Sequence, residues 1–97
     1  EPAKTGEPDQ FVAGGWLRMT DPAADAFFRV KWVNWQGTVF QTDVLRPEKP
    51  SSEWQELRTV LTRPKRASAA IFECVLGAGS KGFAVFDDMV LAPMRSQ

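Results

Sequence analysis

The stretch AFFRVKWVNW at residues 26–35 decides the fold class of this chain. Phe28, Val30 and Trp32 occupy every second position, with a cation in each gap between them. A period of two is typical of a β-strand, because successive side chains of a strand point to opposite faces of the sheet. The stretch therefore predicts a strand that buries one face, with Trp32 in the core.

Further segments of strand character lie on both sides of this one, separated by turn signals rich in glycine and proline. They are residues 11–19, 39–45, 54–61, 68–76 and 83–91. The segment 68–76 is almost continuously apolar, so we expect a central strand that is covered on both faces. Short strands joined by short connections predict an all-β fold, an antiparallel β-sandwich or barrel.

Length and composition limit the possible functions. The chain has 97 residues, enough for one domain, and its 43% hydrophobic content is close to the ~45–50% of globular proteins. Twelve basic residues balance 12 acidic ones, so no net charge attracts nucleic acid or an anionic membrane. The apolar stretches are far shorter than the ~20 residues that cross a bilayer. We expect neither nucleic-acid binding nor membrane insertion.

The chain also lacks the residue type that is used most often in acid–base catalysis. It has no histidine, the commonest general base and zinc ligand. A single cysteine, Cys74, excludes an internal disulfide and a cysteine metal cluster. Catalysis by carboxylates alone would need two of them in a deep cleft, for which a chain this short has little material. We therefore predict that the chain is not an enzyme.

The two ends of the chain differ from its middle. Residues 1–10 are polar and carry two prolines, which predicts a linker or tail. Residues 11–92 then form the sandwich domain, and residues 93–97 form a C-terminal tail. Because the chain begins at Glu1 rather than at a methionine, we expect that a leader or an upstream region has been removed.

Three motifs follow one another along the chain: FVAGGWLR at 11–18, WQEL at 54–57 before an Arg-Pro pair, and FAVFDDMVL at 83–91 after a glycine-rich turn. They resemble motifs of jelly-roll carbohydrate-binding modules, which are galactose-binding-like β-sandwiches. The resemblance implies a domain of that fold that binds a polysaccharide or oligosaccharide, on a secreted or cell-surface protein of bacterial type. The low cysteine content fits a reducing compartment equally well, so the location rests on the resemblance.

The resemblance covers the C-terminal two-thirds of such a module. The N-terminal strands of the family, with their acidic element, have no counterpart in this sequence. Either the chain is a fragment, or it is a compact variant, or another chain supplies the missing strands. These modules often hold a structural calcium between the acidic element and an Asp-Asp pair, which implies Asp87 and Asp88 as metal ligands. Calcium takes about six to eight oxygens, and these two residues supply fewer.

Two tryptophans have the chemistry of a sugar-binding site. Sugar rings stack their apolar C–H faces on indoles, while amides and guanidinium groups bind the hydroxyls. Trp35 lies between Asn34 and Gln36 next to a turn, and Trp16 shares a strand face with Arg18. The alternative for either tryptophan is partial burial under a loop. The predicted carbohydrate-binding residues are Trp16, Arg18, Asn34, Trp35, Gln36 and Glu73.

Three other residues are expected to lie in the interior. Trp54 opens a strand segment and is assigned to the core, and Cys74 is read as a small buried hydrophobe. Asp87 is separated from apolar residues of its segment by even numbers of positions, so it is expected to point inward with them. A buried carboxylate needs a hydrogen bond, an ion pair or a metal.

A second function stays open beside carbohydrate binding. A sandwich that is short of strands leaves an unpaired sheet edge, which is a template for another chain. The domain would then be a structural or assembly unit, with a protein partner or a homo-oligomer formed through that edge. A third alternative is an accessory domain that packs against a separate catalytic part.

Overall fold

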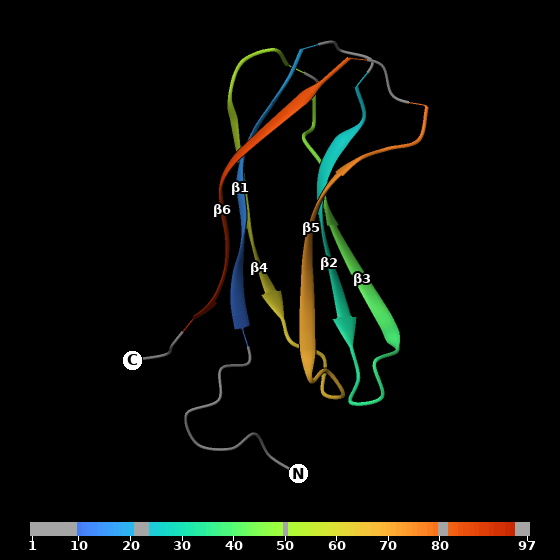
Figure 1. Cartoon of the computed structure of the whole chain (residues 1–97). Coiled ribbons are helices and arrows are strands. Elements are labelled where there is room, and N and C mark those ends of the chain that lie inside the picture. Colours follow the sequence, from blue (N-terminus) through green and yellow to red (C-terminus); the bar gives the residue numbers. More distant parts are fainter. Residues whose placement is uncertain (1–9, 21–23, 50, 80–81, 95–97) are drawn as a thin grey trace.

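The computed structural model describes residues 10–20, 24–49, 51–79 and 82–94, and these residues form β-strands without a helix (Figure 1). The strands are β1 (Gln10–Met19), β2 (Ala26–Val33), β3 (Val39–Leu45), β4 (Gln55–Thr62), β5 (Ala69–Leu76) and β6 (Ala84–Met94). Each lies within a few residues of a predicted segment, so the all-β prediction is confirmed. Within the described ranges, no helix is long and apolar enough to cross a membrane.

The strands form two antiparallel sheets of three strands each. Sheet A has the order β4-β1-β6, and sheet B has the order β3-β2-β5. The sheets face each other in a β-sandwich, with sheet A to the left and sheet B to the right in Figure 1. The β2–β3 hairpin stays within sheet B, whereas every other connection passes from one sheet to the other. The predicted antiparallel sandwich is thus confirmed, with β1 and β2 as its central strands.

The prediction that residues 68–76 form a central, covered strand is wrong. β5 is an edge strand of sheet B, and Ile71, Cys74 and Leu76 are exposed. Cys74 is therefore not the buried hydrophobe that its apolar neighbours suggested. A run of apolar residues indicates that a strand favours burial, but it does not say which strand will lie beside it. The central position belongs to β2, which pairs with both β3 and β5.

The core fills the space between the two sheets in two clusters. In one cluster, the ring of Phe28 contacts Phe72 and Phe86 at centroid distances of 5.5 and 5.4 Å. In the other, the fully buried Trp32 meets the edge of Phe11 at 5.9 Å. Burying one such side chain stabilises the fold by roughly 1.5–3 kcal/mol. The prediction that Trp32 lies in the core is confirmed.

Candidate functional site

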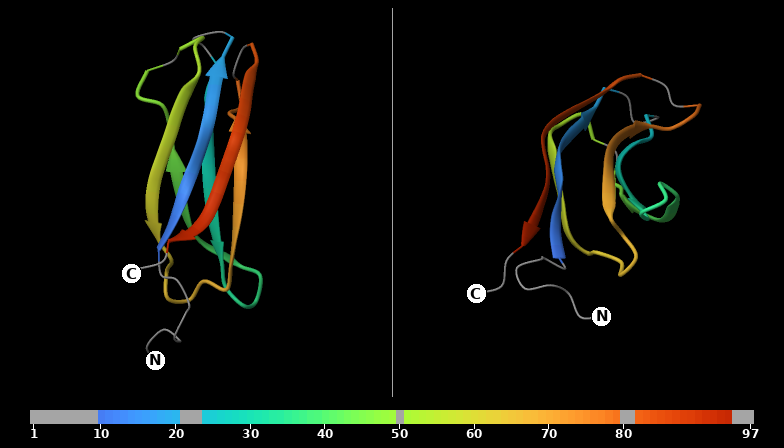
Figure 2. Two further views of the ribbon diagram at one scale, coloured as in Figure 1. Left: turned by 90° about the vertical axis from the view of Figure 1, so that its left-hand side faces the viewer. Right: turned by 60° about the horizontal axis from the view of Figure 1, so that its bottom comes forward.

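The outer face of sheet A carries an exposed indole between two carboxylates. Trp16 of β1 lies opposite Glu56 of β4 and opposite Asp87 of β6. Directly opposite residues of antiparallel strands project from the same face. Trp16 is 36% exposed, and both carboxylates are exposed as well. The left view of Figure 2 looks onto this face, with β1 between β4 and β6.

Two arginines and a second tryptophan extend this face. The guanidinium of Arg18 lies 5.7 Å from the ring centroid of Trp54, at cation–π distance. Nη2 of Arg58 lies 2.8 Å from Oε2 of Glu56 in an ion pair. We call the resulting set the sheet A patch. It consists of Trp16, Arg18, Trp54, Glu56, Arg58 and Asp87.

The prediction that Trp54 belongs to the core is wrong. Its side chain is 43% exposed, because residue 54 precedes β4 and shares parity with the outward-facing Glu56 and Arg58. A tryptophan that shares a strand face with an arginine is the signal that singled out Trp16 and Arg18. The same signal was present at Trp54, which shares a face with Arg58, and it could have placed this residue in the site.

A bulge in sheet A explains why Asp87 lies on the outer face. The β1–β6 register shifts between Gly14 and Trp16, and Asp88 has a positive φ of 50°. A bulge places an extra residue on one strand and breaks the alternation of faces. Leu91 lies opposite the buried Ala13, yet Asp87 lies opposite the exposed Trp16. The prediction that Asp87 points inward is therefore wrong, because parity does not carry across the bulge.

Trp35 lies in the β2–β3 hairpin, which is at the bottom of the sandwich in Figure 1, whereas β4 starts at the top. Its indole is 81% exposed. The side-chain oxygen of Asn34 accepts hydrogen bonds from the backbone N–H groups of Gln36 and Thr38, both at 3.0 Å. This oxygen therefore builds the turn. The structure does not bring the hairpin residues together with Trp16.

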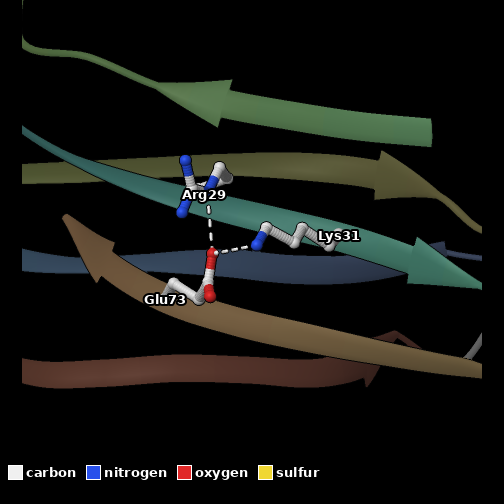
Figure 3. A network of polar contacts seen from close by, with 3 residues as sticks. All are labelled: Arg29, Lys31 and Glu73. Atoms are coloured by element: carbon white, nitrogen blue, oxygen red, sulfur yellow. Dashed lines mark hydrogen bonds and ion pairs between the residues drawn. The ribbon is translucent and has the colours of Figure 1, made fainter. Parts of the chain in front are cut away.

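Glu73 lies in a third place, on the outer face of sheet B (Figure 3). Its Oε1 is 2.7 Å from Nε of Arg29 and 3.3 Å from Nζ of Lys31. The hydrogen bond from Arg29 is the largest influence and lowers the pKa of the Glu73 carboxyl below its ordinary value of 4.5. The six predicted carbohydrate-binding residues thus occupy three separate regions, and of these the structure brings Trp16 and Arg18 to the sheet A patch.

Asp87 and Asp88 provide few ligands for a metal. The backbone N–H of Asp88 donates to Oδ1 of Asp87 at 2.8 Å, and both side chains are exposed. In the part of the chain that the structure describes, no group of three or more His, Cys, Asp or Glu residues is placed to hold a metal. Two carboxylates do not complete a calcium shell of about six to eight oxygens. Calcium binding by Asp87 and Asp88 stays a prediction that requires further ligands.

No family model, curated protein or solved structure matches this chain. The function is therefore argued from the sheet A patch itself. Its exposed indole offers a flat apolar surface, and its carboxylates and guanidinium groups offer hydrogen-bond acceptors and donors. The chemistry of this surface suits ligands that combine apolar and hydroxyl-bearing faces.

The ion pairs of Glu73 lead to a prediction about acid stability. Because the pKa of Glu73 is lowered in the folded state, its stabilising effect is complete above the unfolded pKa of 4.5. The effect is lost as the pH falls through the lower folded pKa. Between about pH 7 and about pH 3, the urea midpoint should therefore fall less in E73Q than in the unmodified chain. Tryptophan fluorescence measures both midpoints.

The matched control for this prediction is Glu48→Gln, which removes an exposed carboxylate from the β3–β4 connection. Its urea midpoint should fall with pH as much as that of the unmodified chain. If E73Q also loses as much stability as the unmodified chain, the ion pairs in Figure 3 do not stabilise the fold.

Proposed function

We propose that this chain is a non-catalytic carbohydrate-binding module of the jelly-roll, galactose-binding-like type, and that the sheet A patch is its binding surface. The observation that supports this most is the exposed indole of Trp16 between the carboxylates of Glu56 and Asp87. A sugar ring stacks on the indole, and its hydroxyls donate to the two carboxylates. The parent protein is proposed to act outside the cell, on the basis of the motif resemblance.

The charges of the patch favour one class of sugar. Carboxylates on both sides of Trp16 accept hydrogen bonds from neutral hydroxyls. The charges of Glu56 and Arg58 offset each other in their ion pair, and Arg18 lies over Trp54. Asp87 beside Trp16 is left to repel the carboxylate of a uronic acid at close range. The patch therefore favours neutral or amino sugars. Binding is weak, since the patch is exposed and water competes for each hydrogen bond.

We expect Trp16→Ala to weaken the binding of a neutral oligosaccharide about tenfold. Loss of a stacking contact worth up to ~1.5 kcal/mol corresponds to about one order of magnitude in affinity. Isothermal titration calorimetry with a panel of neutral, amino and acidic oligosaccharides measures the change. A urea midpoint near that of the unmodified chain shows that the variant is folded.

Trp35→Ala is the matched control, because it removes an exposed indole from the other end of the sandwich. Its affinity should equal that of the unmodified chain. If W35A loses binding while W16A keeps it, the site lies at the hairpin rather than on sheet A. If the folded protein binds no sugar of the panel, the carbohydrate-binding proposal is wrong.

A further inference from the structure

The outer edge of β5 lacks the features that usually protect a strand edge. Such edges carry charges, prolines or bulges, which prevent pairing with another chain. β6 has a bulge at Asp88 together with Pro93, and β4 carries charged residues of both signs. β5 pairs with β2 in one unbroken register, contains no proline, and has Glu73 as its one charged residue. That charge is already neutralised by cations of β2.

The interior of the sandwich is incompletely covered along β5. Cys74 lies opposite Phe28, and Leu76 lies opposite Ala26. Phe28 and Ala26 are buried core residues, so Cys74 and Leu76 also project from the inner face of sheet B. Nevertheless Cys74 is exposed, and Leu76 is 46% exposed. Apolar surface that faces the core is therefore left in contact with solvent on this side.

The opposite edge of sheet B is different, because two of its inner positions are polar and a third, Leu45, is buried. Gln41 and Asp43 of β3 lie opposite Trp32 and Val30, on the inner face. Asp43 accepts a hydrogen bond from Nε1 of Trp32 at 2.8 Å, and Gln41 Nε2 donates to the same carboxylate at 3.4 Å. Polar groups thus close the β3 side toward water, whereas the β5 side ends in apolar groups.

The sequence of β5 is complementary to itself in antiparallel pairing. Its first residues are small and its last residues are larger. When Phe72 is placed opposite the partner's Phe72, Ala70 lies opposite the partner's Cys74, and Ala69 lies opposite the partner's Val75. Glu73 then lies opposite the partner's Ile71 rather than opposite the same carboxylate. Each small side chain meets a larger one, and like charges are kept apart.

We propose that two copies of this chain pair antiparallel through β5, with Phe72 opposite the partner's Phe72. The pairing joins the two B sheets into one continuous sheet, with both inner faces on the same side. It covers Cys74 and Leu76 and leaves no free edge at β5. The chain has no net charge, so no overall repulsion opposes the association. A foreign strand would also cover the edge, but the self-complementary order of side chains favours a second copy.

Substitutions at Ile71 test this register. Ile71→Glu places a carboxylate opposite the partner's Glu73 twice in each dimer, and the dissociation constant should rise on the order of tenfold. Ile71→Gln leaves the position uncharged and should keep the dimer intact, whereas a lysine would lie opposite Lys31 of its own chain. Val44→Glu is the matched control, because Val44 is as exposed on β3 (46%) as Ile71 is on β5 (45%). Sedimentation velocity over a range of concentrations measures all three.

A disulfide tests the register directly. In the proposed dimer, A70C brings a new thiol opposite the partner's Cys74, where the Cα atoms lie about 4.5–5.5 Å apart, which suits a disulfide. Within one chain, positions 70 and 74 lie about 13 Å apart along the strand, too far for a disulfide. A70C should therefore form a covalent dimer on mild oxidation, and A69C should not. Partial burial raises the pKa of the Cys74 thiol, so the oxidation is run at mildly alkaline pH.

A monomer at every concentration overturns the proposal, even if that monomer binds an apolar peptide along β5. So does a dimer that I71E does not weaken, or one that I71E, I71Q and V44E weaken equally. Covalent dimers of A69C but not of A70C overturn the register. Sugar binding at the sheet A patch does not involve β5, so W16A leaves the dimer intact. The two proposals therefore fail separately.

Discussion

Gly14→Ala is expected to destabilise the fold by ~3 kcal/mol, because β1 and β4 approach each other too closely at this position for a side chain. A Cβ atom on Gly14 would lie 2.0 Å from the carbonyl oxygen of Leu57 and 2.8 Å from Cα of Arg58. Both are backbone atoms of β4, so no side-chain rotation relieves the clash. The strands would have to separate where they pair. Urea unfolding followed by tryptophan fluorescence measures the loss.

The neighbouring glycine provides a matched control. A Cβ atom on Gly15 would lie 2.9 Å from Cζ of Phe28 and 3.1 Å from Cα of Met89. The closest atom is 2.9 Å away rather than 2.0 Å, and it belongs to a side chain rather than to the backbone, so Gly15→Ala should cost less than Gly14→Ala. Equal losses in the two variants, or a neutral Gly14→Ala, would contradict the close approach of β1 and β4.

The fold class could be predicted because its signals are local. The alternation in β2 and the turn residues between segments predicted antiparallel strands, and Trp32 was correctly placed in the core. The order of strands in the sheets could not be predicted. β2 is central and still carries Arg29 and Lys31, because both cations project from the solvent-facing side of sheet B, where they pair with Glu73 of β5. That pairing exists only once the two strands lie side by side.

The candidate site was predictable only within single strands. Trp16 and Arg18 share an outer face because β1 is regular between them. Their neighbours in the sheet A patch come from β4 and β6, which are distant in sequence, and the cross-strand register decides which residues meet. The bulge at Asp88 then reversed the face on which Asp87 lies. The alternation of side chains along one strand predicts neither where a bulge occurs nor which residues of a partner strand lie opposite.

Trp32→Ala is expected to cost ~3–5 kcal/mol, the largest effect of a single substitution proposed for this chain. The indole is buried between the sheets, where it contacts Phe11, and its loss leaves a large cavity. Chemical denaturation followed by circular dichroism suits this variant, because the substitution removes one of the fluorescent tryptophans. Trp35→Ala is the control, since its indole is exposed and its truncation should leave the urea midpoint nearly unchanged.

The hydrogen bond of Trp32 can be separated from its packing by a double-mutant cycle. Asp43→Ala leaves the buried Nε1–H group of Trp32 without its carboxylate acceptor, which costs ~1–3 kcal/mol. Trp32→Phe keeps an aromatic ring and removes the donor. If the pair acts as the geometry indicates, the double variant loses less stability than the sum of the single variants. Additive losses would mean that Asp43 stabilises β3 through Gln41 instead, and that water satisfies the indole.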